Sequence, residues 1–192
     1  VANAPVAPVT QKGIFAFEEH FSKELLESQE RREGVMLRFN SNLGEHMVAW
    51  GLSRLIFGHF STAEVGSFKS KRILKGEALK LQYQIAHQLL EDFLSGKKKT
   101  SEVFDIPSTA KYLAVTEFWN ACHSEIFSNI RFYYNPITSL LEPIGYDAEV
   151  PPATLSKEPS LCTFTVSEFA MKLLLDKEMA LSFERELRRV LN

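Results

Sequence analysis

Two side chains with hard oxygen atoms, Asn129 and Asp147, flank a segment with the pattern of a β-hairpin. Residues 130–134 alternate in character with a period of two, residues 135–139 are rich in turn formers, and residues 140–146 form a second apolar run. Pairing the two strands would bring Asn129 and Asp147 to within about 6 to 8 Å at the open end of the hairpin. Two converging oxygen ligands suit a Mg²⁺ ion that also holds phosphate groups.

This hairpin resembles that of the CotH family of atypical, secretory-pathway-type protein kinases. Family members carry an Asp-x-x-x-x-Asn element, a strand, a turn, and a second strand that ends near a metal-binding Asp. The matching positions in this chain are Asn129, Tyr133-Tyr134-Asn135-Pro136, Leu141-Glu142-Pro143-Ile144 and Asp147. The resemblance extends from residue 13 to residue 149 and is most specific in the hairpin. It implies Asn129 and Asp147 as ligands of Mg²⁺, with Mn²⁺ as a second possibility.

Two upstream segments extend the resemblance. Residues 13–21 are similar to a G-x-Y-x-x-x-E segment that leads into a helix, and residues 34–39 resemble the next family strand. The resemblance implies cofactor-binding roles for Glu19, which matches the ion-pair partner of a phosphate-contacting Lys, and for Arg38, which could face a phosphate. The alternatives are a carboxylate that favours a helix N-terminus at Glu19 and an outward residue of a half-exposed strand at Arg38.

The position of the family's catalytic Asp, five residues before Asn129, is occupied by Ser124. A Ser cannot act as the carboxylate base that deprotonates a substrate hydroxyl. His123 or Glu125 could substitute for that carboxylate, and His123 or Ser124 stands at the base position itself. The resemblance implies a protein kinase that transfers phosphate from Mg²⁺–ATP to Ser/Thr of a protein substrate. The alternative is a catalytically silent, nucleotide-binding or structural interaction protein with the same fold.

The expected fold class is α+β and kinase-like, with a small strand-containing N-terminal part and a mainly helical lobe that carries the metal-site hairpin. Besides the hairpin, the sequence patterns predict strands at 14–19 and 34–40, helices from near Ser22, at 78–94, 107–122, 166–175 and 177–191, and an irregular insertion at 41–75 with at most one short helix around 49–57. The apolar stripe of helix 78–94 should be buried together with two residues of helix 107–122, Leu113 and Phe118. The stripe consists of Leu79, Ala86, Leu89, Leu90 and Phe93.

Several helix ends carry sequence signals. Gly96 suits the end of helix 78–94, and Asp105 is the expected N-cap of the following helix. The spacing of Thr165 and Glu168 is that of a capping box, and Asp176 separates the last two helices.

The composition favours a single globular domain. The chain has 192 residues, of which 45% are hydrophobic and 24% charged, and its net charge is −2. This charge gives no reason to expect nucleic acid as a partner, and no apolar run approaches the ~18 residues of a membrane span. Zinc-protease, P-loop and nucleophile-elbow motifs do not occur. The two cysteines, Cys122 and Cys162, are too few for a disulfide framework and leave the compartment open.

We expect residues 13–192 to form one CotH-kinase-like domain and residues 1–12 to be a tail or the edge of an excerpt. In the family, a glycine-containing region that covers the nucleotide and a phosphate-contacting Lys come before the segment that matches Gly13. The sequence before Gly13 has no such region, so we expect this chain to be part of a longer polypeptide.

Overall fold

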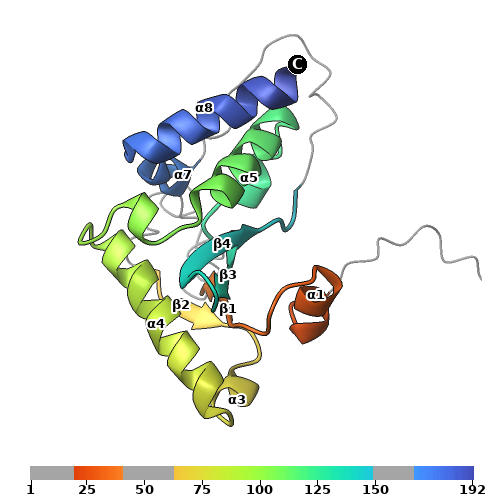
Figure 1. Cartoon of the computed structure of the whole chain (residues 1–192), viewed down its shortest axis with the longest axis vertical. Coiled ribbons are helices and arrows are strands. Elements are labelled where there is room, and N and C mark those ends of the chain that lie inside the picture. The colour runs from red at the N-terminus through yellow and green to blue at the C-terminus, as the bar shows by residue number, and fades with distance from the viewer. Residues whose placement is uncertain (1–19, 41–62, 149–166) are drawn as a thin grey trace, which may run out of the picture.

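The structure is a computed structural model (Figure 1), and it describes residues 20–40, 63–148 and 167–192. Its helices are α1 (Lys23–Ser28), α3 (Ser70–Ile73), α4 (Glu77–Leu94), α5 (Ile106–Phe118), α7 (Glu168–Leu173) and α8 (Lys177–Leu191), with short 3₁₀ helices at Thr100–Glu102 and Cys122–Glu125. The strands are β1 (Met36–Phe39), β2 (Val65–Ser67), β3 (Arg131–Asn135) and β4 (Leu140–Ile144). The strand expected at 14–19 and the short helix expected around 49–57 lie outside the described residues.

The four strands form one antiparallel sheet in the order β2-β1-β3-β4, a mixed architecture that is compatible with the expected α+β class. The predicted hairpin is confirmed, since β3 pairs with β4 from Arg131 opposite Ile144 to Asn135 opposite Leu140. Asn135 closes the turn, because its backbone oxygen accepts the Ser139 amide at 2.8 Å and its side-chain oxygen accepts the Ile137 amide at 3.0 Å. The open end of the hairpin therefore carries the segments just before Arg131 and just after Ile144.

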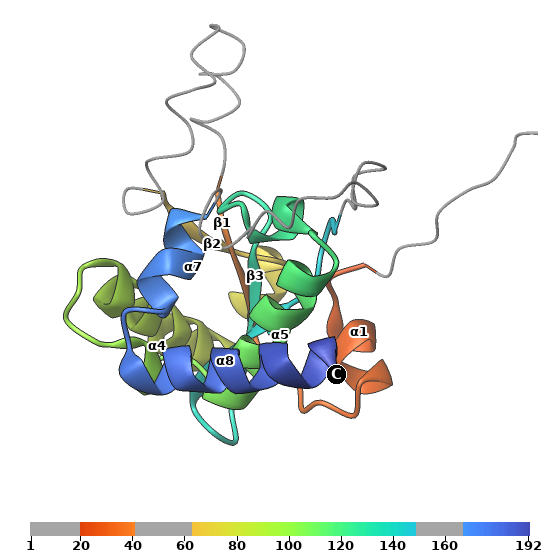
Figure 2. The same cartoon turned by 90° about the horizontal axis from the view of Figure 1, so that it is seen from above.

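Helices cover both faces of this sheet. In Figures 1 and 2 the sheet lies between α4 on one side and α1 on the other. The main core, on the α4 side, contains a group of buried aromatic rings: Phe39, Phe93, Phe104, Phe132 and Phe169. The smaller cluster, on the α1 side, consists of Phe21, Leu26, Met36 and Tyr133. All residues of β3 are therefore buried. Its alternating side chains pack into the main core on one face and into the smaller cluster on the other.

The strand predicted at 34–40 is confirmed as β1, and the chain just before it approaches β3 very closely. The Tyr134 amide donates to the Val35 oxygen at 2.9 Å. A Cβ atom at Gly34 would lie 2.4 Å from the Tyr134 oxygen and 2.7 Å from the Tyr133 ring. Only a residue without a side chain fits between β1 and the hairpin at this point.

The helix predicted at 78–94 is confirmed as α4, including its end, because Gly96 has a left-handed φ of 76° just beyond Ser95. Four residues of its predicted apolar stripe are buried, namely Ala86, Leu89, Leu90 and Phe93, and Leu79 is partly buried against them. Leu113 of α5 belongs to the same core. The predicted burial of this stripe together with Leu113 is therefore confirmed.

The prediction for α5 was correct at its start and wrong at its end. Asp105 caps the helix, with its side chain accepting the Ser108 amide at 2.9 Å. The helix stops at Phe118 instead of residue 122, because Asn120 has a left-handed φ of 50° and the Ala121 amide turns back to the Thr116 oxygen at 2.8 Å. Phe118 is 45% exposed and does not join the core, contrary to the sequence expectation.

The interpretation of residues 41–75 as irregular was wrong for their described part. Val65 is buried and pairs opposite Phe39, which places β2 at the edge of the sheet. The helix α3 follows directly. A strand of three residues with Gly66 in its centre is too short to produce a readable period of two, so only its pairing with β1 identifies it.

The last two helices begin at capping side chains. Ser167 caps α7 by accepting the Ala170 amide at 3.1 Å, so the cap is not Thr165, which lies outside the described residues. Asp176 caps α8 through the Glu178 amide at 2.9 Å. Figures 1 and 2 show α8 running beside α5.

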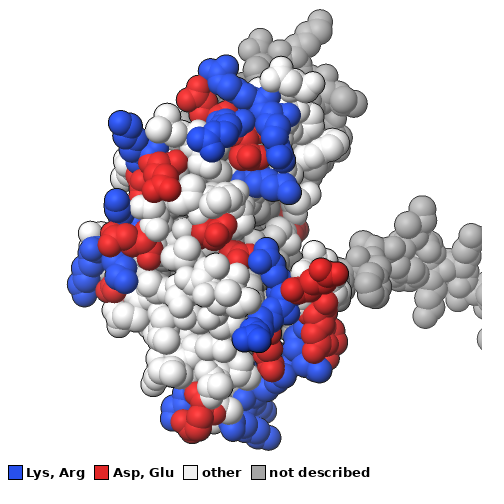
Figure 3. All heavy atoms as spheres, viewed as in Figure 1, with Lys and Arg blue, Asp and Glu red and all other residues white. Residues whose placement is uncertain are grey.

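The surface carries charges of both signs. On the face shown in Figure 3, Lys and Arg side chains are interspersed with Asp and Glu. Within the described ranges, none of the helices has the length and apolar character needed to cross a bilayer.

Candidate functional site

Asn129 and Asp147 meet at the open end of the hairpin, as the sequence pattern predicted. The Nδ2 atom of Asn129 donates to Oδ2 of Asp147 at 3.1 Å and to the backbone oxygen of His123 at 3.0 Å. Their expected proximity is thus confirmed, whereas their role as metal ligands remains a prediction.

Local backbone structure fixes both side chains. The amides of Asn129 and Ile130 both donate to the Ile126 oxygen, at 2.8 and 3.0 Å, which forms a tight turn immediately before β3. Asp147 follows β4 with a left-handed φ of 49°, a conformation that Asp and Asn adopt more readily than most residues. This turn in the backbone directs the chain after β4 towards Asn129.

His123 completes the cluster. Its Nδ1 atom lies 3.2 Å from Oδ2 of Asp147, and the two side chains are 41% and 44% exposed. Nδ1 also lies 3.3 Å from Nδ2 of Asn129. We refer to Asn129, Asp147 and His123 as the hairpin-end cluster. Because the carboxylate and the imidazole are both partly exposed, a ligand can approach this cluster from solvent.

Ser124 and Glu125 point into the protein instead. Ser124 is 1% exposed, and its hydroxyl donates to the Ala121 oxygen at 2.8 Å. Glu125 is fully buried and accepts a short hydrogen bond from the Thr116 hydroxyl. Both side chains are therefore engaged in the packing of this loop against α5.

Tyr112 of α5 holds the same loop from the other side. Its hydroxyl donates to the Ser124 oxygen at 2.8 Å. Burial raises the pKa of the Tyr112 phenol far above its usual value, so this group stays a neutral hydrogen-bond donor. Together with the Thr116 hydroxyl it fixes the segment that leads from α5 to Asn129.

The two predicted cofactor-binding residues have different outcomes. Glu19 lies outside the described residues. Arg38 is exposed on β1, and its guanidinium lies 5.1 Å from the centre of the Phe68 ring. It is directly opposite Arg131 of β3 in the sheet register, which places a second arginine on the same face.

Arg131 is a residue whose importance the sequence pattern did not reveal. It is 8% exposed, and its Nη1 atom donates to the backbone oxygens of Ser128 at 2.6 Å and Ile130 at 3.1 Å. Its guanidinium lies 4.8 Å from the centre of the ring of Tyr146, the residue that precedes Asp147. The available signal was a single charged residue within an aromatic strand, two positions after Asn129.

The donor set of the hairpin-end cluster suits a cation that arrives with phosphate groups. Mg²⁺ takes oxygen ligands and is commonly held by one or two protein carboxylates together with substrate phosphates. Asp147 supplies one exposed carboxylate, and the amide oxygen of Asn129 can face it after a rotation of the amide group. Among the described residues, no three His, Cys, Asp or Glu side chains group as a metal site, so a cation bound by protein ligands alone is not supported there.

Comparisons with models of protein families, with curated proteins and with solved structures found no match to this chain.

Proposed function

We propose that this chain is a CotH-like protein kinase domain that binds Mg²⁺–ATP, or Mn²⁺–ATP, at the hairpin-end cluster and transfers the terminal phosphate to Ser/Thr of a protein. The observation that carries the proposal is the 3.1 Å contact between Asn129 and Asp147, two oxygen-bearing side chains at the ends of paired strands. In this proposal the amide of Asn129 rotates so that its oxygen, instead of its nitrogen, faces the cation. Asp147 and Asn129 would hold the cation, and the cation would supply positive charge that stabilises the phosphates during transfer.

In this proposal His123 occupies the position of the general base. Of the three side chains considered for it, His123 reaches the surface beside Asp147, whereas Ser124 and Glu125 are buried and hydrogen-bonded within the loop. A neutral imidazole can accept a proton from a substrate hydroxyl. The carboxylate that the family uses for this step has no counterpart at Ser124, which leaves His123 to orient the substrate.

A second candidate function is nucleotide binding without phosphate transfer. The specific observation in its favour is the burial of Ser124 and Glu125, because neither can approach a substrate hydroxyl without rearrangement of the loop. Such a protein would use the same cation and phosphate contacts to respond to nucleotide.

Calorimetric titration with ATP, in the presence and absence of Mg²⁺ or Mn²⁺, tests the binding step on the full-length protein. We expect binding that requires the divalent cation and that Asp147→Ala abolishes. Asp92→Ala, which removes a carboxylate of α4 that is paired with Lys97 and not with the hairpin-end cluster, is the matched control and should bind normally. Cation-independent binding, or equal binding by both variants, would contradict the proposed site.

Phosphate transfer to a broad panel of proteins, followed with labelled ATP, separates the two candidate functions. Incorporation that is lost in Asp147→Ala supports the kinase. Cation-dependent ATP binding without incorporation supports the silent protein.

A further inference from the structure

Arg131 is a buried cation without an acidic partner at ion-pair distance among the described residues. Its Nη1 atom is used by two backbone oxygens, and its buried Nε atom has no hydrogen-bond acceptor within the described part of the chain. A guanidinium stays protonated at neutral pH, and removing its charge from water is costly unless an anion compensates it.

Aromatic rings surround this guanidinium but cannot neutralise it. The ring centres of Tyr146, Phe68 and Phe21 lie 4.8, 5.7 and 6.0 Å from its central carbon. Contacts of this type are worth about 0.5–2 kcal/mol and attract the cation to the ring face. They hold Arg131 in one orientation and leave its full positive charge in place.

Arg38 adds a second positive charge at the same point of the sheet. It lies opposite Arg131 on the neighbouring strand, and the two guanidinium carbons lie 5.1 and 5.7 Å from the centre of the shared Phe68 ring. The two arginines therefore place two positive charges side by side on this face of the sheet.

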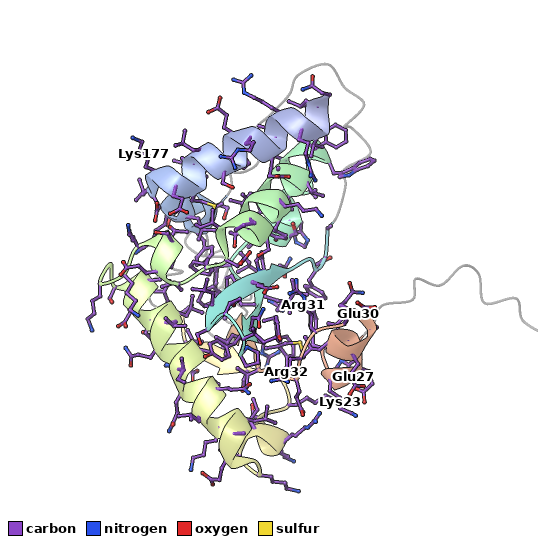
Figure 4. All side chains as sticks on the ribbon, viewed as in Figure 1. Lys23, Glu27, Glu30, Arg31, Arg32 and Lys177 are labelled. Carbon is purple, nitrogen blue, oxygen red and sulfur yellow. The ribbon has the colours of Figure 1, made fainter. Side chains whose placement is uncertain are left out.

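Arg31, on the same side of the sheet, is arranged differently. Arg31, which lies between α1 and the sheet in Figure 4, is paired with the buried Glu142 at 2.8 Å. The Asn135 side chain donates to the same carboxylate at 2.7 Å. The fold therefore supplies a carboxylate for Arg31 but not, within the described residues, for the more deeply buried Arg131.

We propose that Arg131 and Arg38 form a phosphate-binding pair that receives the polyphosphate of the nucleotide, beside the cation held by Asn129 and Asp147. This inference rests on the proposed function for its ligand and names the residues that would hold its phosphates. Guanidinium groups bind phosphate oxygens through parallel N–H groups, and Arg38 is open to solvent where such a ligand would enter. Arg131 follows Asn129 by two positions, so the cation and phosphate sites adjoin.

The test is calorimetric titration of the full-length protein with tripolyphosphate and with inorganic phosphate without divalent cations, and with ATP in Mg²⁺. Arg38→Gln changes an exposed side chain and should leave the fold intact. We expect it to weaken tripolyphosphate and ATP about tenfold each, the size of one lost charged hydrogen bond. Arg188→Gln, which removes a charge from the exposed end of α8, is the control and should change neither affinity.

Arg131→Lys is the second variant. It keeps the positive charge but removes the planar guanidinium group and its parallel N–H donors. We expect it to weaken tripolyphosphate by about tenfold or more, and the rise in melting temperature that tripolyphosphate produces should shrink accordingly. If Arg131→Lys lowers the melting temperature equally with and without tripolyphosphate, Arg131 is only a structural cation and the inference is overturned.

The outcomes separate this inference from the proposed function. One outcome is tripolyphosphate binding that depends on Arg38 and Arg131, with ATP binding that is unchanged by Mg²⁺ or by Asp147→Ala. This outcome supports the phosphate-binding pair and contradicts the metal site. Mg²⁺-dependent ATP binding with normal affinity in both arginine variants supports the metal site and overturns the pair. Tighter binding of inorganic phosphate than of ATP would identify a free oxyanion, and not a nucleotide, as the ligand.

Discussion

The side-chain amide of Asn129 donates to the carboxylate of Asp147 at 3.1 Å, although the two residues are 18 positions apart in the sequence. The pairing of β3 with β4 produces this contact, because it places the residues before β3 beside the residues after β4 at the open end of the hairpin. In the proposed function this hairpin end holds a cation and a phosphate group, and the first two predictions concern the residues beside it.

His123→Ala should reduce turnover without removing nucleotide binding. General-base assistance is worth roughly 10²–10⁴-fold in rate, while the cation is held by other residues. Parallel measurement of ATP affinity and of phosphate incorporation checks this expectation. His87→Ala, which removes an imidazole that packs against Tyr83 of the same helix α4, is the control. A His123→Ala protein with unchanged turnover would exclude His123 from the chemistry.

Ser124→Asp should destabilise the protein instead of restoring a catalytic base. The Ser124 hydroxyl is buried and donates to the Ala121 oxygen, whereas an ionised Asp cannot donate and would be buried next to Glu125. A buried group without a partner costs about 1–3 kcal/mol, and more when charged. Urea unfolding measures the loss, and Ser124→Ala should lose only about 0.5–1.5 kcal/mol. A stable Ser124→Asp protein with increased phosphate transfer would show that the loop can turn residue 124 outwards.

Leu89→Ala should lower the free energy of unfolding by about 2–5 kcal/mol, because it leaves a cavity in the main core. Leu89 is 8% exposed on α4, whereas Leu81 on the same helix is 58% exposed. Leu81→Ala is therefore the control and should change stability by only about 0.5 kcal/mol. Denaturant unfolding of the two variants compares the faces of one helix, and equal losses would mean that α4 is packed on both faces.

Gly34→Ala should weaken the contact between β1 and the hairpin. The new methyl group would lie 2.4 Å from the Tyr134 oxygen, so the strands must move apart. Overpacking of this kind costs about 1–3 kcal/mol. Gly145→Ala, where nothing lies within 4 Å, should cost much less in the same thermal unfolding assay. Equal melting temperatures for both variants would contradict the close approach at Gly34.

Asp176 should contribute a pH-dependent part of the stability. Burial alone would raise its pKa, but hydrogen bonds from Ser101 and from the Glu178 amide lower the pKa below the ordinary 3.8. The carboxylate is therefore bound more favourably in the folded state, and its contribution is complete above pH 3.8 and is lost as the pH falls through the lower folded-state pKa.

We expect Asp176→Ala to be less stable than wild type by about 0.5–2 kcal/mol at pH 7, the usual value of a helix cap. The difference should shrink in urea unfolding at pH 3 and below. Asp176→Asn keeps a capping oxygen without titrating, so the gap between the Asn and Ala variants should not depend on pH. A gap between wild type and Asp176→Ala that is constant from pH 7 to pH 2 would refute the assignment.

The sequence determined the features of this protein that depend on neighbours along the chain. The alternation after Asn129 and the turn at Asn135 specified the hairpin, and the period of 3.6 specified α4. Asp105 and Asp176 marked the starts of α5 and α8 through hydrogen bonds to amides two or three residues away. These signals act within a few residues, so they can be read without knowledge of the fold.

Only the tertiary structure decided which polar groups are buried and what they contact. Glu125 has the sequence context of an exposed loop residue, but its side chain meets Thr116 of α5 and its backbone oxygen accepts the Ser167 hydroxyl from 42 positions away. Arg38 and Arg131 are adjacent because β1 pairs with β3 across a separation of 93 positions. Burial and charge proximity depend on such long-range pairings, and no local pattern encodes them.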